Sequence, residues 1–231
     1  KDVDGKSYWY FSIVDLATTF HVATLINSHT SQEFAMAFER CWASWAGVPD
    51  RVHFDMERGF GGALSELFQS FNTVQLPIAG QAHWQLGRVE RQGAWWKELA
   101  ARTIEHSSIK GEDEMRTLGI MVSGAKNSLR KRAGFSPAQW VLGRDPKMPA
   151  DLVDDTANYS AHSLAANDEK IRRRYAIRTA ARESFMRMQN DDQLRRAMLA
   201  RARTVATPLS VGEMCYVLRQ VKKKEQREQQ Q

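Results

Sequence analysis

The order of the apolar runs along this chain is the feature that most limits its fold. Runs typical of buried strands cover residues 8–14, 20–26 and 51–55, and a short fourth run covers 74–78. From residue 30 onward these runs alternate with segments whose apolar residues recur at helical spacing. Two strands followed by alternating helices and strands favour a mixed sheet that is flanked by helices. The expected fold class is therefore α/β.

Helices are expected in the segments between and beyond these strands. Thr30 and Glu33 form the pattern of a capping box, and the apolar stripe that follows runs until Gly47 and Pro49 end the helix. Further helices are expected around residues 64–71, 86–106 and 125–131. Four tryptophans in these segments are expected in the core or at a subunit interface: Trp42, Trp45, Trp95 and Trp96.

The character of the chain changes near residue 149, which divides it into three parts. Residues 1–148 carry the pattern of a folded core, and residues 149–206 form a polar linker followed by an arginine-rich helical segment. Because that segment has many long charged side chains and few large apolar ones, it is expected to pack little against the core. Residues 207–231 contain one predicted strand. Because a single strand cannot form a barrel, they resemble the start of a truncated small β domain.

The composition of the chain indicates which kinds of binding partner and which kinds of functional site to expect. The chain has 231 residues, of which 42% are hydrophobic, so it can bury a core of ordinary size. Its net charge of +6 favours an anionic partner, nucleic acid first, although a mildly basic soluble protein is the simpler alternative. No apolar run approaches membrane-spanning length. Cys41 and Cys215 stand far apart and outside any Cys-x-x-Cys cluster, so neither a zinc site nor a disulfide framework is expected.

Two acidic residues occupy positions from which they can converge. Asp55 ends the third apolar run, and Glu90, 35 positions later, stands at the start of a long helical segment. One helix and one strand separate them, so both carboxylates can reach a single point. Oxygen-only ligation suits Mg²⁺ or Mn²⁺, and a pair of such ions can clamp the attacking and leaving oxygens of a phosphodiester. The simpler alternatives are a turn residue at a strand end for Asp55 and a solvated helix acid for Glu90.

Four segments in this order carry a family likeness. They are Phe-Ser-Ile-Val-Asp-Leu-Ala-Thr-Thr-Phe at 11–20, Asp-Met-Glu-Arg-Gly-Phe at 55–60, His-Trp-Gln-Leu-Gly-Arg-Val-Glu-Arg at 83–91, and Gly-Phe-Ser-Pro-Ala-Gln-Trp-Val-Leu-Gly-Arg at 134–144. Together they resemble the catalytic core of retroviral and retrotransposon integrases, which belong to the ribonuclease H-like polynucleotidyl transferases. The resemblance spans roughly residues 1–148.

The resemblance implies a fold, a reaction and a set of site residues. The fold would be a ribonuclease H-like mixed sheet of five strands flanked by helices, followed by a basic helical linker. The reaction would be DNA integration by metal-dependent strand transfer, with Asp55 and Glu90 as catalytic acids that ligate Mg²⁺ or Mn²⁺ in a two-metal site. Gln85, Arg91 and Lys97 would contact DNA. A solvated lysine is an equal alternative for Lys97.

The family's first catalytic Asp has no clear counterpart in this chain. Asp2 and Asp4 belong to a turn, and Asp15 matches a non-catalytic acid, so the first Asp is expected upstream of Lys1, with Asp4 as an alternative. The chain would then be an N-terminally truncated fragment that is inactive alone. Two other functions stay open: a catalytically dead remnant that binds nucleic acid, and a ribonuclease H-like nuclease. The resemblance also implies DNA partners (element ends and target), a homo-oligomer, no membrane association and a nuclear location.

Overall fold

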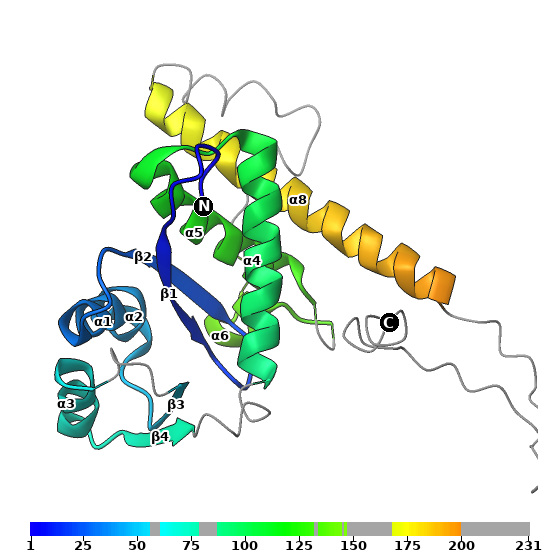
Figure 1. Cartoon of the computed structure of the whole chain (residues 1–231). Coiled ribbons are helices and arrows are strands. Elements are labelled where there is room, and N and C mark those ends of the chain that lie inside the picture. The colour runs from blue at the N-terminus through cyan, green and yellow to red at the C-terminus, as the bar shows by residue number, and fades with distance from the viewer. Residues whose placement is uncertain (56–60, 79–86, 132–133, 145, 147–167, 200–231) are drawn as a thin grey trace, which may run out of the picture. The chain divides into compact units, whose positions relative to one another are not determined.

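A computed structural model describes residues 1–55, 61–78, 87–131, 134–144, 146 and 168–199 (Figure 1). Residues Lys1–Asp192 form one compact unit, and Gln193–Gln231 form a second one. The predicted linker at 149–167 and the predicted β segment at 207–231 lie outside the described residues. The three-part division of the chain therefore stays a prediction.

Four strands form two small sheets, at the positions that the apolar runs predicted. Strands β1 (Trp9–Val14) and β2 (His21–Ile26) pair antiparallel, with Trp9 opposite Ile26. Strands β3 (Arg51–Asp55) and β4 (Val74–Ile78) pair in parallel, with Asp55 opposite Ile78. The mixed α/β class is thus confirmed. Within the described residues β1 pairs only with β2 and β3 only with β4, so each of the four strands keeps one open edge.

One face of the β1–β2 hairpin packs on the N-terminal helices (Figure 1). These are α1 (Ser31–Phe38), a π-helical turn η1 (Glu39–Ala43), α2 (Ser44–Ala46) and α3 (Ala63–Ser70). Thr30 caps α1 by accepting a hydrogen bond from the Glu33 backbone amide, which is one half of the predicted capping box, while the Glu33 carboxylate lies 3.8 Å from Arg40. Phe11 of β1 and Val52 of β3 pack in the same cluster, so both sheets share this core.

The other face of the hairpin packs on two of three long helices, α4 (Gly87–Ser107) and α5 (Gly111–Leu129), and the third, α8 (Glu169–Leu199), joins their hydrophobic cluster. A short helix α6 (Pro137–Leu142) follows α5. Helix α5 begins 14 residues before the predicted 125. Side chains from all three long helices and from β2 form one hydrophobic cluster. Trp96 of α4 is buried in it as predicted, whereas Trp45 of α2 is 42% exposed.

Helix α8 corrects one prediction from the sequence. The segment is helical as expected, but the expectation that it packs little against the core is wrong. Its sparse apolar residues, Ile177, Ala181, Phe185 and Met188, are spaced by three or four positions, and all four are buried in the α4–α5 cluster. Arg173 adds a bidentate ion pair to Glu114 of α5, with nitrogen–oxygen distances of 2.7 and 2.8 Å.

Helix α5 lies close against the hairpin. Asn127 exchanges two hydrogen bonds of 2.9 Å with the backbone of His21, and the Tyr10 hydroxyl donates to the Met115 carbonyl. Gly119 marks the closest approach, because a Cβ built there would stand 2.8 Å from the Tyr10 ring and 3.1 Å from the Ala23 carbonyl oxygen. Gly124 of the same helix has nothing within 4 Å of such a Cβ.

This difference gives a paired prediction. Gly119→Ala should lower the free energy of unfolding by about 1–3 kcal/mol, because the new methyl group overpacks a contact that includes backbone. Gly124→Ala should raise it by about 0.5–1 kcal/mol, because alanine is the better helix former. Urea unfolding of both variants measures this. Equal effects of the two substitutions would contradict the close packing of α5 on β1.

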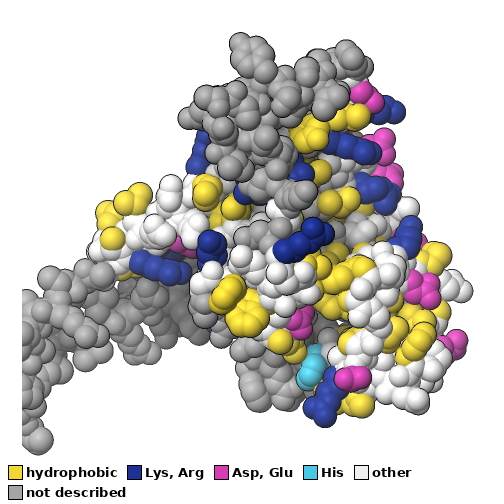
Figure 2. All heavy atoms as spheres, turned by 180° about the vertical axis from the view of Figure 1, so that it is seen from behind, with side chains coloured by type: hydrophobic (Ala, Val, Ile, Leu, Met, Phe, Trp, Pro, Cys, Tyr) yellow, Lys and Arg dark blue, Asp and Glu magenta, His cyan; other side chains and the backbone are white. Residues whose placement is uncertain are grey.

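Large apolar side chains also reach the surface. Ile120 is 62% exposed and Trp140 is 56% exposed. Figure 2 shows hydrophobic side chains at several places on one face, interleaved with basic and acidic ones. Among the helices that the structure describes, none is long and apolar enough to cross a membrane.

Candidate functional site

The paired ends of β3 and β4 form the edge at which the predicted acids belong. Because the two strands are parallel and Asp55 pairs with Ile78, both strands end side by side, at the usual separation of about 4.8 Å. From Ile78 the chain passes through residues 79–86 into α4. Asp55 therefore stands next to the residue from which the chain leaves for the helix that carries Glu90.

Glu90 lies in the first turn of α4, and its side chain is exposed. The partial positive charge of a helix N-terminus stabilises a carboxylate at this position. The side chain of Asp55 lies outside the described residues, as does the whole of segment 79–86 with Gln85. The convergence of the two carboxylates and the role of Gln85 therefore stay predictions.

The other predicted DNA contacts are on the exposed side of α4. Lys97 follows Glu90 by two helical turns, about 10 Å along the axis and on the same flank of the helix. Arg91 and Lys97 are both exposed, whereas Trp96, Leu99 and Thr103 cover the buried face. The structure thus leaves both basic side chains accessible to a ligand.

The remaining acids near the start of the chain are used in local structure. Asp2 accepts hydrogen bonds from the amides of Asp4, Lys6 and Gly111 and from the Tyr8 hydroxyl. Burial alone would raise the pKa of Asp2, but these hydrogen bonds outweigh it and hold the pKa below its ordinary value.

Asp4 and Asp15 are occupied in the same way. Asp4 forms an ion pair of 2.8 Å with Lys110, and Asp15 accepts a 2.9 Å hydrogen bond from the Thr18 amide. Asp15 therefore caps the turn that follows β1. Among the residues that the structure describes, no three His, Cys, Asp or Glu side chains are close enough together to hold a metal ion.

A buried polar chain links β1, β2 and α5, and sequence reasoning missed it. Lys126 and His21 are almost completely buried, and Lys126 Nζ is 2.7 Å from His21 Nδ1. His21 Nε2 is 2.6 Å from Ser12 Oγ. When Lys126 is charged it donates to Nδ1, so the ring carries its proton on Nε2 and donates to Ser12. No local motif signals a contact between residues 105 positions apart.

Burial sets the ionisation of this pair. It lowers the pKa of Lys126 to about 7, with the charge of Arg130 as the second cause. Burial also lowers the pKa of His21 to about 3, helped by the charge of Lys126. The imidazole is therefore neutral at physiological pH, and the amine changes its charge close to neutrality. Because Lys126 is fully buried, this chain of side chains holds the fold and is not exposed to a substrate.

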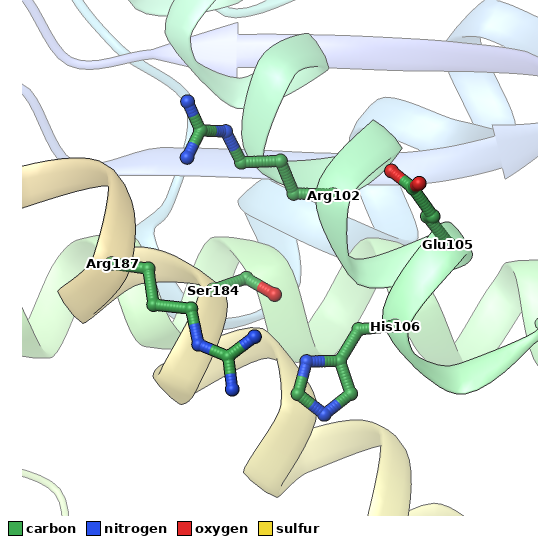
Figure 3. A pocket seen from close by; sticks show the side chains of 5 residues that line it. All are labelled: Arg102, Glu105, His106, Ser184 and Arg187. Carbon is green, nitrogen blue, oxygen red and sulfur yellow. The ribbon is translucent and has the colours of Figure 1, made fainter. Parts of the chain in front are cut away.

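A polar cleft of about 540 Å³ separates α4 from α8 (Figure 3). Arg102, His106 and Arg187 line it, and each of them lies close to a carboxylate. Arg102 pairs with Asp191 at 2.7 Å and with Glu98 at 2.9 Å. His106 and Arg187 both pair with Glu183, at 3.4 and 3.8 Å. The cleft therefore behaves as a salt-bridged helix contact.

Comparison with solved structures gives distant likenesses, one of them to an integrase core. No family model matches this chain, and no curated protein matches it in sequence. Among solved structures, the chain is similar to the catalytic core domain of BIV integrase in crystal form I, with 16% sequence identity and a TM-score of 0.47. The alignment covers 59% of this chain and 86% of that chain. This likeness is too distant to assign the chain to a family or to an activity.

Proposed function

We propose that this chain is part of a metal-dependent polynucleotidyl transferase that joins DNA ends to target DNA, as integrases do. Asp55 and Glu90 would ligate Mg²⁺ or Mn²⁺, while Gln85, Arg91 and Lys97 would hold DNA. The protein would work as a homo-oligomer in the nucleus, where integration takes place. The observation that carries the proposal is the parallel register of β3 and β4, which sets Asp55 beside the exit toward Glu90.

The donor chemistry of the two acids fits the proposed ions. Carboxylate oxygens are the ligands that Mg²⁺ and Mn²⁺ prefer, and no sulfur or imidazole ligand is needed. When bound, such ions polarise a phosphate and activate a water or a 3′-hydroxyl. The residues of this chain would hold the ions and position DNA. No covalent bond between protein and DNA is required.

The two small sheets support a further strand between them. An antiparallel pair and a parallel pair that share a core would fit one mixed sheet if a further strand paired between them. We propose that such a strand pairs with β1 and β3, completes a five-stranded ribonuclease H-like sheet and carries the third acid. The hydrogen bonds of Asp2 and the ion pair of Asp4 argue against either residue in that role.

Metal binding tests the two acids directly. Asp55→Asn and Glu90→Gln should each weaken Mn²⁺ binding to the chain by on the order of tenfold, because each removes one charged ligand. Glu105→Gln is the control, since Glu105 is an exposed acid of the same helix 15 residues further on. Titration followed by the electron spin resonance of free Mn²⁺ measures all four proteins. Equal losses in all three variants would show non-specific binding and reject the site.

A nucleic-acid-binding module without catalysis is the second candidate. The observation that favours it is that Arg174, Arg178 and Arg182 of α8 have no acidic partner among the described residues, and contacts from them to nucleic acid need neither a metal nor a third acid. A ribonuclease H-like nuclease would use the same two acids and differ only in its nucleophile, which would always be water. Joining assays that also record hydrolysed ends distinguish these functions.

A further inference from the structure

The six arginines of α8 that belong to the compact unit Lys1–Asp192 fall into two sets that differ in their partners. Arg172, Arg173 and Arg187 form ion pairs with Glu169, Glu114 and Glu183 respectively. Arg174, Arg178 and Arg182 make no ion pair or hydrogen bond with any described residue. They are spaced four positions apart, so they lie along one side of the helix. We call these three residues the arginine stripe.

Two members of the stripe line a cleft between α8 and α5. The cleft has a volume of about 210 Å³, and Arg178 and Arg182 face Ile120, Met121 and Ser128 of α5 across it. Arg178 and Arg182 are half-buried residues, whereas Arg174 is exposed at one end of the stripe. From Arg174 to Arg182 the stripe extends about 12 Å along the helix axis.

The electrostatics of the cleft are unfavourable without a ligand. Arg178 and Arg182 have the same charge at positions i and i+4, where side chains are neighbours on a helix. Burial and the nearby charge of Arg178 both lower the pKa of Arg182. An anion placed between the two groups would offset the repulsion and restore the hydrogen bonds that burial removes. Guanidinium groups match phosphate oxygens in geometry as well as in charge.

We propose that the arginine stripe and its cleft bind the phosphodiester backbone of a nucleic acid. A single small anion would fill the cleft but leave Arg174 unused, whereas successive phosphates of one strand can reach the whole stripe. The site is separate from the Asp55–Glu90 edge, because it lies between α5 and α8. This inference deepens the proposed function. It rests on that function only for the choice of nucleic acid as the ligand, since a polynucleotidyl transferase must also hold DNA outside its catalytic acids.

Binding of a fluorescent 20-base-pair duplex, measured in EDTA at several salt concentrations, tests the stripe. The variant R178Q/R182Q should bind the duplex on the order of tenfold more weakly at low salt. The slope of log Kd against the logarithm of the salt concentration should be smaller by about 2 for this variant. The matched control R172Q/R187Q removes the same two positive charges from arginines that already have acidic partners. It should bind within about twofold of the original chain.

Three outcomes would overturn the inference. One is equal weakening of both double variants, which would mean that net charge alone drives binding. Another is unchanged binding by R178Q/R182Q, and the third is no binding of DNA by the original chain at low salt. If R178Q/R182Q does not fold, R174Q decides, because Arg174 is exposed; it should lower the salt dependence by about 1.

The same assay separates this inference from the catalytic proposal. D55N/E90Q lacks the proposed metal ligands but keeps the stripe, so it should bind the duplex normally in EDTA. If that variant loses metal binding but binds DNA normally, the result bears on the catalytic acids and leaves the arginine stripe unaffected. Loss of DNA binding in R178Q/R182Q with normal Mn²⁺ binding concerns the stripe only.

Discussion

A chain extended by one upstream strand that carries an Asp should join labelled DNA ends in the presence of Mn²⁺, whereas residues 1–231 alone should not. Two carboxylates can hold one hard cation loosely, but two ions about 3.5–4 Å apart need a shared third acid to offset their repulsion. Asp4 cannot supply it while it pairs with Lys110 at the turn. The new strand would also cover the open edges of β1 and β3, which are otherwise templates for unwanted pairing.

The expected effect is large. Joining should rise from background to a readily measured rate, and Asp55→Asn or Glu90→Gln in the extended chain should reduce it at least about 100-fold, since each removes a ligand that acts on the reacting phosphate. Two results would change this interpretation. If residues 1–231 already join DNA and Asp4→Asn abolishes joining, Asp4 is the third acid. If the extended chain is inactive but binds DNA, the binding module is the better description.

The elements that the sequence predicted best are those with strong local signals. The four strands are compact apolar runs between turn residues, and the start of α1 has a capping residue at Thr30. Helix α5 begins at Gly111, well before the segment 125–131 in which a helix was expected, and its buried positions Met115, Leu118 and Val122 recur at helical spacing in that earlier stretch. The packing of α8 was missed because small residues, Ala180, Ala181 and Ser184, fill half of its six buried positions.

The parts of the site that were missed depend on tertiary contacts. His21 and Lys126 read as a strand residue and a helix residue, and only the docking of α5 on β2 brings them together. The division of the α8 arginines into paired and unpaired sets depends likewise on Glu114, which lies 59 positions before Arg173. For Asp55 and Glu90 the sequence shows their order and their spacing along the chain. The register of β3 with β4 adds that Asp55 lies at the sheet edge from which the chain continues toward Glu90.

Lys126→Met should remove a strong pH dependence from the stability of the protein. In the folded chain the pKa of Lys126 is about 7, against 10.5 for the free side chain, because burial disfavours the charged amine. Between these values the unfolded chain binds more protons than the folded one, so stability rises with pH in that window. The buried charge lowers the free energy of unfolding by its full amount below pH 7, and this loss of stability disappears above about pH 10.5.

The difference in the free energy of unfolding between Lys126→Met and the original chain should therefore change by about 3 kcal/mol from pH 7 to pH 9.5, in favour of the original chain at the higher pH. Comparing the difference at each pH cancels the titration of every other group. Lys97→Met is the control, because Lys97 is exposed and its difference should stay flat. Urea unfolding at five pH values measures both. A flat profile for Lys126→Met would mean that the amine reaches solvent, and the buried contact with His21 would then be wrong.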